Sequence, residues 1–417
     1  MNFKHVDIEK TIELERARHE LENKSQRTPM RVYLVSLELP EDDSADIQEN
    51  LVELGALVRT LGDECVAALV QKKSKPVPST FIGQGKVEEI KASIHALKID
   101  YVVFDQNLSP SQVRNLEQIL GKLVIDRTGI ILQIFRRNAR TKEARTQVEI
   151  AHLEYTAPRL SNAWISWERQ RGSGGSGGRL KGTGEAQIEI DRRKLKDKVA
   201  SLKKELEKIQ KEREVARKSR IDEWNVILVG YTNAGKTTLM NALTESQLSA
   251  KDSLFETLDS SVRKLKGSNN TNILITDTVG FIRNLPHGLV ASFRSTLEEV
   301  TKADLILHIV DISHPSYKDH IRVTEDILEQ LHAKDIPKVI VFNKIDNLSD
   351  EPKLPKILAR VYPKSICVST KNEEDIKKIR DFVLDFIGQN LLEEVIRVPY
   401  YNNKLLSLIY SHSRIIS

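Results

Sequence analysis

The chain has 417 residues, and its 64 Lys and Arg against 59 Asp and Glu leave a formal net charge of only +5. This length exceeds what one hydrophobic core usually covers, and a composition of 40% hydrophobic and 29% charged residues excludes a disordered chain. No apolar run approaches the roughly 20 residues that cross a bilayer, and the charged start MNFKHVDIEK argues against a signal peptide. We therefore expect no integral membrane association. Cys65 and Cys367 lie far apart without metal-ligand spacing, which favours a reducing, cytoplasmic location.

The near-neutral total hides a basic middle region. From Arg136 to Arg220 the chain has 23 basic and 12 acidic side chains, a local charge of +11 that leaves −6 for the rest. This placement predicts an anionic partner for the middle region alone.

The first part of the chain reads as a charged N-terminal arm, residues 1–27, followed by an α/β domain over residues 28–136. In that domain apolar strand segments alternate with helical spacing, which predicts βαβ units and a mostly parallel sheet. The expected strands are 32–37, 66–70, 101–104 and 123–125, and the expected helices are 47–61, 86–97 and 109–120. Gly83 to Lys86 could hold a phosphate, although a glycine turn before a helix is the commoner meaning.

Residues 137–222 change character and predict an antiparallel helical hairpin with a glycine-rich loop at 172–184. Two apolar seams support this prediction, Ala144, Val148, Ala151 and Tyr155 on the first helix and Leu195, Val199, Leu202, Leu206 and Ile209 on the second. The loop contains seven of the 19 glycines. It could be a flexible linker. Its basic flanks, with Trp164 and Trp167 nearby, favour insertion into RNA instead, and the residues that would bind are Arg169, Arg171, Arg179 and Lys181.

The α/β rhythm returns over residues 223–390, where five buried strands are expected at 225–229, 273–276, 305–310, 338–342 and 365–368. The remaining residues, 391–417, form a short C-terminal extension that is too small for a core of its own. The predicted fold class is therefore α/β: an N-terminal α/β domain with a parallel sheet, a basic helical hairpin and a P-loop GTPase domain.

That last assignment depends first on a phosphate-binding loop between a strand and a helix. The segment Gly230-Tyr231-Thr232-Asn233-Ala234-Gly235-Lys236-Thr237, followed by Thr238, fits G-x-x-x-x-G-K-[ST] in the required context. The glycines let backbone amides face the phosphates at a helix N-terminus, Lys236 would reach the β- and γ-phosphates, and Thr237 would bind Mg²⁺.

Two further segments predict the γ-phosphate and Mg²⁺ side of the site. Asp277-Thr278-Val279-Gly280 follows a strand as a D-x-x-G element, with Asp277 bound to the metal through water. Between this element and the phosphate loop, the segment with Phe255 and Thr257 would be the mobile switch whose threonine completes the metal shell. An ordinary surface threonine is the alternative reading of Thr257.

Guanine selection is predicted by Asn343-Lys344-Ile345-Asp346 at the end of a strand. The Asp346 carboxylate can accept from guanine N1–H and the 2-amino group, whereas adenine has no matching donors. Asn343 and Lys344 would brace the base and the phosphate loop, and Ser369-Thr370-Lys371 would bring backbone amides near the guanine oxygen.

Phe281 stands directly after the D-x-x-G element, where many GTPases have a water-positioning glutamine. Phenylalanine cannot orient water, so the catalytic group is not evident and Lys236 alone is assigned to transition-state charge. Either hydrolysis is slow, or a group arrives from elsewhere in the chain or from a partner.

Together these residues resemble the HflX family of ribosome-associated GTPases, among the Obg-HflX-like translational GTPases. The resemblance covers most of the chain and includes Phe81 to Lys86, Asp105 to Pro110, the loop 172–184, Gly230 to Thr238, Phe255 to Asp259 and Asp277 to Arg283. Departures are Asp259-Ser260-Ser261, where relatives often have Asp-Pro-Thr, and Ser369-Thr370-Lys371 in place of Ser-Ala-Lys.

The resemblance implies GTP and GDP as ligands, Mg²⁺ as cofactor, and binding to the large ribosomal subunit and ribosomal RNA rather than DNA. It also implies ribosome-stimulated hydrolysis, a role in splitting or rescuing stalled ribosomes under stress, and a monomer away from the ribosome. Two other readings remain open: an RNA- or ribosome-binding adaptor in which hydrolysis only resets binding, and a membrane- or protein-signalling GTPase. The basic loop and the lack of lipidation signals weigh against the last.

Overall fold

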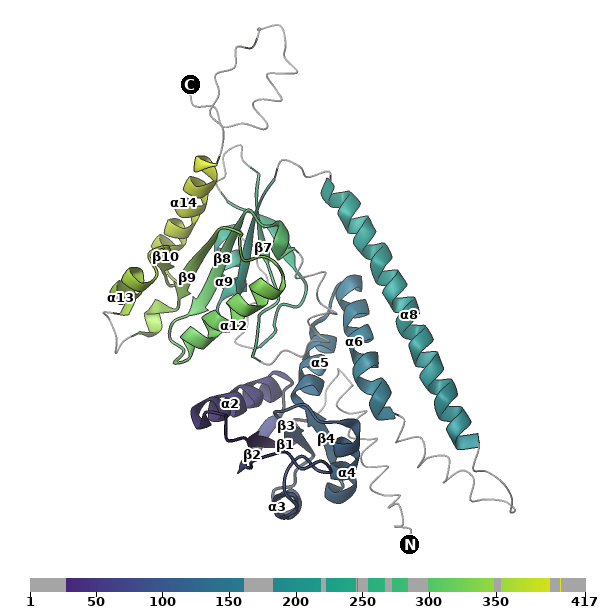
Figure 1. Cartoon of the computed structure of the whole chain (residues 1–417). Coiled ribbons are helices and arrows are strands. Elements are labelled where there is room, and N and C mark those ends of the chain that lie inside the picture. The colour runs from purple at the N-terminus through teal and green to yellow at the C-terminus, as the bar shows by residue number, and fades with distance from the viewer. Residues whose placement is uncertain are drawn as a thin grey trace, which may run out of the picture. The chain divides into compact units, whose positions relative to one another are not determined.

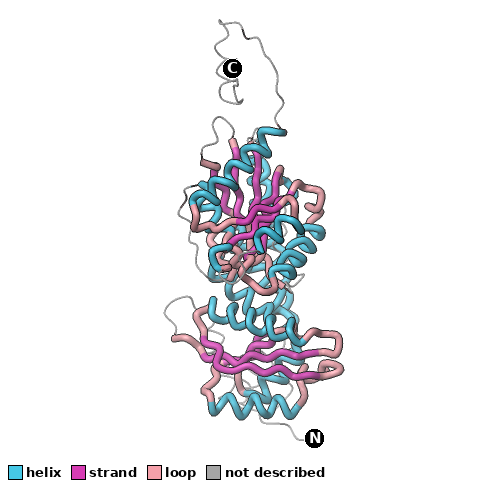
Figure 2. The backbone as a smooth tube through the Cα atoms, turned by 90° about the vertical axis from the view of Figure 1, so that its left-hand side faces the viewer, coloured by secondary structure: helices cyan, strands magenta, loops and turns pink. Residues whose placement is uncertain are grey.

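The structure is a computed structural model that describes residues 28–160, 183–218, 223–244, 246, 254–266, 272–283, 299–348, 354–390 and 398. These residues fall into two compact units, one up to Lys208 and one from Ile209 onward. The arm 1–27, the four basic residues assigned to RNA and nearly all of the extension 391–417 lie outside the described residues. The predicted α/β class is confirmed, with helices on both sides of each sheet (Figures 1 and 2).

The first unit is built on a four-stranded, wholly parallel sheet of order β2-β1-β3-β4. Its strands are β1 (Arg31–Glu38), β2 (Glu64–Lys72), β3 (Tyr101–Phe104) and β4 (Leu123–Asp126), joined by helices α2 (Ser44–Thr60), α3 (Gln84–Ala96) and α4 (Pro110–Leu120). Helix α4 begins where expected because Ser109 and Gln112 form a capping box and Pro110 occupies the first turn.

The described helices that follow the last strand of that sheet are α5 (Arg127–Asn138), α6 (Lys142–Leu160) and α8 (Thr183–Lys218). Within the first unit α6 and α8 run side by side in opposite directions (Figure 1), linked by the ion pairs Lys142–Glu205, Glu149–Lys198 and Glu154–Lys203. The seam residues Ala144, Val148 and Ala151 are buried. Because α8 begins at Thr183, the last two residues of the predicted loop 172–184 belong to the helix.

Helix α6 is fastened to the end of β4 through the carboxylate of Asp126, which is fully buried. Its Oδ1 accepts from the Gly129 amide at 3.0 Å and from the Tyr155 hydroxyl at 2.8 Å. Its Oδ2 accepts from Arg159 Nη2 at 2.9 Å, and the guanidinium stacks over the Tyr155 ring at 3.7 Å. The C-terminal end of α6 is therefore held against the α/β part of the unit.

The second unit contains a six-stranded sheet of order β10-β9-β8-β5-β7-β6, parallel except for the edge strand β6. The strands are β5 (Trp224–Gly230), β6 (Ser261–Lys264), β7 (Ile273–Asp277), β8 (Leu305–Asp311), β9 (Lys338–Asn343) and β10 (Ser365–Cys367). The helices are α9 (Lys236–Thr244), α12 (Tyr317–Gln330), α13 (Leu354–Val361) and α14 (Glu373–Gln389), with single 3₁₀ turns η1 (Val300–Lys302) and η2 (Ile345–Asn347).

Among the described residues, hydrophobic clusters lie on both faces of this sheet. On one face Val226 and Leu228 pack with residues of α9 and α14, and on the other Ile227 and Val229 pack with residues of α12. The alternation along β5 is the period expected for a strand buried on both faces. Because the parallel strands end at one edge, the segments that follow β5, β7, β9 and β10 meet there, which is where α/β sheets bind ligands. Among the described helices, none combines the length and apolar character needed to cross a bilayer.

Candidate nucleotide-binding site

The loop after β5 can form only because glycine occupies two of its positions. Gly230 has φ +150°, and a Cβ there would lie 2.2 Å from the Ile309 carbonyl oxygen. Gly235 has φ +96°, and a Cβ there would lie 2.2 Å from Nδ2 of Asn343. Left-handed backbone and close approach together require glycine. The loop is thereby wrapped tightly at the N-terminus of α9.

Lys236, at the start of α9, is folded back into this loop. Its Nζ donates to the carbonyl oxygens of Gly230 at 3.1 Å and Tyr231 at 2.8 Å, and the residue is buried. Burial lowers the pKa of Lys236 to about 8, while the nearby Asp277 carboxylate raises it. A cation held in this way is ready to bind an anion that enters the loop.

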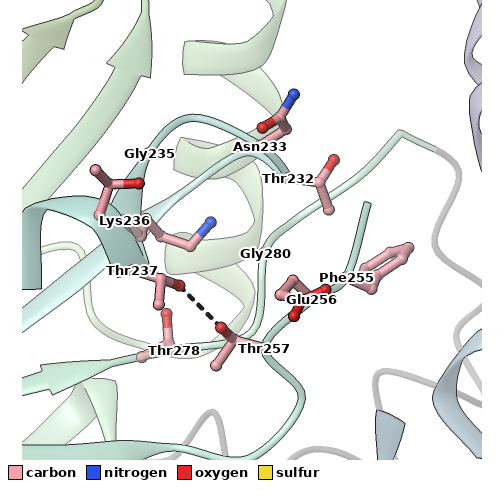
Figure 3. Close-up of a pocket in the computed structure, with 11 residues that line it drawn as sticks. Thr232, Asn233, Gly235, Lys236, Thr237, Phe255, Glu256, Thr257, Thr278 and Gly280 are labelled. Carbon is pink, nitrogen blue, oxygen red and sulfur yellow. Dashed lines mark hydrogen bonds between the residues drawn. The ribbon is translucent and has the colours of Figure 1, made fainter. Parts of the chain in front are cut away.

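A pocket opens beside Lys236, between the phosphate loop, the switch segment and the D-x-x-G element (Figure 3). The described residues that line it are Thr232, Asn233, Gly235, Lys236, Thr237, Thr238, Phe255, Glu256, Thr257, Thr278 and Gly280. The Thr232 hydroxyl is buried and has no hydrogen-bond partner among the described residues. A buried hydroxyl without a partner is costly, so this atom favours a ligand with acceptor oxygens.

Three oxygens of metal-ligating type lie together where Thr237 and Thr257 of the pocket lining meet the buried Asp277 behind them. Thr237 Oγ1 donates to Asp277 Oδ2 at 2.7 Å. It also lies 2.9 Å from Thr257 Oγ1, as the dashed line in Figure 3 marks. Within the described part of the chain, the second carboxylate oxygen of Asp277 is buried without a hydrogen-bond partner, and burial raises the pKa of this carboxyl. All three atoms are hard oxygen ligands, and the unsatisfied carboxylate oxygen fits a divalent cation with its water shell. These are the three residues assigned to Mg²⁺ from the sequence.

The predicted guanine-contacting residues gather in a second cluster at the ends of β9 and β10. Asn343 is buried, donates to the Ala234 carbonyl at 2.9 Å and accepts from the Thr370 amide at 3.2 Å, so it joins the phosphate loop to the loop after β10. Lys344, with φ 65°, forms an ion pair with Asp311 at 2.7 Å.

Asp346, on η2, presents its carboxylate to the same loop. It accepts from Ser369 Oγ and from Lys371 Nζ, each at 2.7 Å. The Lys371 hydrogen bond, followed by that of Ser369, lowers the pKa of Asp346 below its ordinary value. The carboxylate is thus anionic and positioned to accept from a base.

Other members of the predicted set support the loop, and most of them do not line the pocket. Ala234 and Val279 are buried, and Tyr231 stacks on His320 with 3.8 Å between ring centroids while its hydroxyl accepts from the Arg283 amide. Thr278 lines the pocket but donates its hydroxyl to the Leu228 carbonyl at 2.7 Å. The glycine turn near Gly83 caps α3, and its amide donates to Gln71 Oε1 at 2.8 Å.

Phe281 points into the core and away from the pocket. It is 1% exposed and packs with Val229, Ile306 and Leu328. Its amide donates to the Gly230 carbonyl and its carbonyl accepts from the Thr232 amide, which ties the D-x-x-G element to the phosphate loop. The position that holds a glutamine in many GTPases is structural in this chain. Sequence reasoning passed over one pocket residue, Glu256, which is signalled only by its place between Phe255 and Thr257.

The fold and the site together define a P-loop GTPase: a mostly parallel sheet, a lysine-bearing phosphate loop, a metal-type oxygen cluster and an aspartate at the base position. Family models match in three successive pieces: the N-terminal region of GTP-binding GTPases over residues 48–136, the middle region of GTP-binding GTPases over 138–220, and a 50S ribosome-binding GTPase domain over 225–344.

Curated relatives match along most of the chain. The GTPase HflX of Gluconacetobacter diazotrophicus is 38% identical, aligned over 92% of this chain and 91% of that protein. The GTPase HflX of Escherichia coli strain K12 is 39% identical, over 87% of this chain and 84% of that protein. This chain belongs to the HflX family of GTPases, as its motifs predicted. A solved GTP-binding protein from Sulfolobus solfataricus in complex with GDP is 23% identical, with a TM-score of 0.46, over 87% of this chain and 100% of that chain.

Proposed function

We propose that this GTPase acts on the ribosome: it binds the large subunit through its basic helical hairpin, hydrolyses GTP there with Mg²⁺, and splits or rescues ribosomes. The burial of Phe281 supports the proposal most directly. A GTPase whose D-x-x-G element is followed by a core residue lacks the usual group that orients water, so rapid turnover requires a partner that supplies such a group or that fixes one from elsewhere in the chain. A large-subunit partner agrees with the ribosome-binding description of the family model that matches residues 225–344 of the second unit.

The nucleotide would span the two clusters at the edge of the second sheet. Lys236 and the Thr232 hydroxyl would bind the phosphates, and Asp346 would accept from the guanine. Thr237, Thr257 and Asp277, the last through water, would hold Mg²⁺, which supplies charge neutralisation at the β- and γ-phosphates. The base loop with Ser369, Thr370 and Lys371 would close over the guanine oxygen.

The hairpin provides the contact surface for RNA. The region from Arg136 to Arg220 has a charge of +11 from 23 basic and 12 acidic side chains, and α8 exposes several of the basic ones. The exposed basic residues of α8 with described side chains include Arg193, Lys196, Lys204, Lys208 and Lys211. Such a helix suits a phosphate-rich surface, because neutralised phosphates release counterions. The loop residues Arg169, Arg171, Arg179 and Lys181 would extend that contact.

Replacing Arg171, Arg179 and Lys181 with alanine tests the RNA contact. We expect weaker sedimentation with large subunits and a shallower dependence of binding on salt, because each lost phosphate contact lowers the salt slope by about 0.7 to 0.9. The matched control for charge replaces with alanine three lysines of the first unit that lie outside the basic region, Lys72, Lys91 and Lys98. If the wild type and the loop variant bind equally at all salt concentrations, the loop serves only as a linker between the two helices.

A second candidate is a nucleotide-gated adaptor, in which hydrolysis only resets binding. The observation behind it is again Phe281, since a site without a water-positioning group at that place could serve as a slow timer. Multiple-turnover GTP hydrolysis with ribosomes separates the two, because an adaptor would stop near one turnover for each binding event. We further propose that the protein is cytoplasmic and that it is monomeric when it is not bound to the ribosome.

A further inference from the structure

Glu256 is the pocket residue that the functional assignment leaves without a role. The three residues of the metal-type cluster, the phosphate-loop lysine and the Thr232 hydroxyl all have a place in the proposed nucleotide site. Glu256 lies on the same wall as Phe255 and Thr257, while Lys236 lies on the facing side (Figure 3). Among the described residues that line the pocket, it is the only one with a carboxylate.

The neighbours of Glu256 fix the direction in which this segment faces. Phe255 and Leu258 are each 2% exposed, whereas Glu256 and Thr257 between them are half-buried and line the pocket. Phe255 has φ 58°, a left-handed conformation that a bulky side chain rarely adopts. The buried side chains of Phe255 and Leu258 therefore hold this segment so that the carboxylate of Glu256 and the hydroxyl of Thr257 both face the pocket.

Electrostatics restricts what a carboxylate can do beside a γ-phosphate. Both groups are anionic acceptors, so neither can donate a hydrogen bond to the other. A donor must therefore lie between them. A water molecule meets this requirement, because it can donate to the carboxylate and turn a lone pair toward the phosphorus.

We infer that Glu256 positions the hydrolytic water and takes the place of the glutamine that this chain lacks after its D-x-x-G element. The inference rests on the proposed placement of the γ-phosphate between Lys236 and Gly280. The water oxygen bonds to the γ-phosphorus, and the bond from that phosphorus to the β–γ bridging oxygen breaks, leaving its electron pair on GDP. One water proton passes to a γ-phosphoryl oxygen, giving dihydrogen phosphate. Glu256 orients the water and ends the reaction ionised.

Two variants of Glu256 and one control test this role in the full-length protein. Glu256→Ala should lower the single-turnover rate of GTP hydrolysis by about 10²-fold, the usual scale for a positioned acceptor. Glu256→Gln keeps a carbonyl acceptor of the same length and should retain a rate within about tenfold of the wild type. Asp259→Ala removes a carboxylate from the same segment but outside the pocket lining, and should leave the rate unchanged.

Binding of fluorescent GDP and of a non-hydrolysable GTP analogue is measured on the same proteins. Affinities within about threefold of the wild type, together with the rate loss in Glu256→Ala and its recovery in Glu256→Gln, support the inference. An unchanged rate in Glu256→Ala overturns the inference. Rate losses in Glu256→Gln and Asp259→Ala that are as large as the loss in Glu256→Ala also overturn it. If the wild type itself fails to bind the analogue, the proposed nucleotide site fails before Glu256 is tested.

Discussion

Asp346 illustrates how one side chain determines the base preference. Both its carboxylate oxygens already accept hydrogen bonds, from Ser369 and Lys371, so the group is held in place before a base arrives. Asp346→Asn places an amide where guanine's 2-amino group donates, while the 2-oxo group of xanthine can accept from it. We expect GTP affinity to fall by about 100-fold or more and xanthosine triphosphate to become the preferred ligand.

Competition between the two nucleotides, measured by fluorescence displacement, checks this change of preference. Asp326→Asn, an exposed carboxylate on α12 of the same unit, is the control and should bind both nucleotides as the wild type does. Unchanged GTP affinity in Asp346→Asn would remove this residue from the base site.

Lys236 links nucleotide binding to pH. Because burial lowers its pKa to about 8, the free protein is partly deprotonated at this residue at pH 8.5. Phosphate oxygens stabilise the ammonium and raise the pKa, so GDP binding should take up a proton at pH 8.5, and affinity should fall as pH rises through 8. At pH 6.5 the lysine is already protonated and this uptake should vanish.

Isothermal titration in buffers of different ionisation enthalpy measures the proton uptake directly. Equal observed enthalpies across buffers at pH 8.5 would mean that Lys236 does not titrate on binding. Comparison of pH 8.5 with pH 6.5 in the same protein provides the internal control.

Single residues also show what sequence alone could and could not supply. Glycine, lysine and threonine at their motif positions predicted the phosphate loop, because close backbone approach admits few alternatives. The side-chain direction of Phe281 and the pocket position of Glu256 depend on packing from β8 and α12 and on the turn at Phe255. No local spacing encodes those contacts.

The helices and strands can likewise be divided into those that the sequence predicted and those that it did not. The bounds of the parallel strands in both sheets were predicted to within two residues of those in the structure. Strands buried on two faces are nearly continuous apolar runs and are therefore easy to locate. Helix α5 was not predicted as a helix, because eight of its 12 residues are buried. Its partly exposed polar positions, Gln133, Arg136 and Arg137, lie in the C-terminal half, so the helical period shows over little more than one turn. Strand β6 was also missed, as its four residues are half-buried or exposed at the sheet edge.

Packing between α5 and α6 gives an element-scale prediction. A Cβ at Gly129 would lie 2.5 Å from Ile125 Cγ2 and 2.6 Å from the Tyr155 hydroxyl oxygen. Gly129→Ala should therefore destabilise the first unit by about 1 to 3 kcal/mol, because Tyr155 must leave its bond to Asp126. Gly85→Ala, in α3 with no atom within 4 Å of its Cβ, should be neutral or up to about 1 kcal/mol stabilising.

Hydrogen exchange resolved to peptides of β4, α5 and α6 measures both changes in the first unit without interference from the second. Faster exchange of these peptides in Gly129→Ala, with no change in Gly85→Ala, is the expected result. Equal protection in the two variants would show that the Gly129 contact is not tight in solution.

At the scale of the whole molecule, the net charge of +5 conceals the arrangement that matters. Along the sequence, a region with a formal charge of +11 that contains the helical hairpin connects the α/β unit to the GTPase unit. The GTPase unit has a buried phenylalanine, Phe281, where many GTPases have a glutamine. The site could be predicted because parallel strands bring distant motifs to one edge.

Turnover of GTP with separated ribosomal subunits, with sedimentation of intact ribosomes in parallel, measures whether the large subunit activates this GTPase and whether the GTPase splits ribosomes. The proposed ribosomal role predicts slow hydrolysis by the protein alone, a rate at least tenfold higher with large subunits, little change with small subunits, and conversion of intact ribosomes to subunits when a GTP analogue is bound. Equal turnover with and without large subunits, and no splitting, would contradict it.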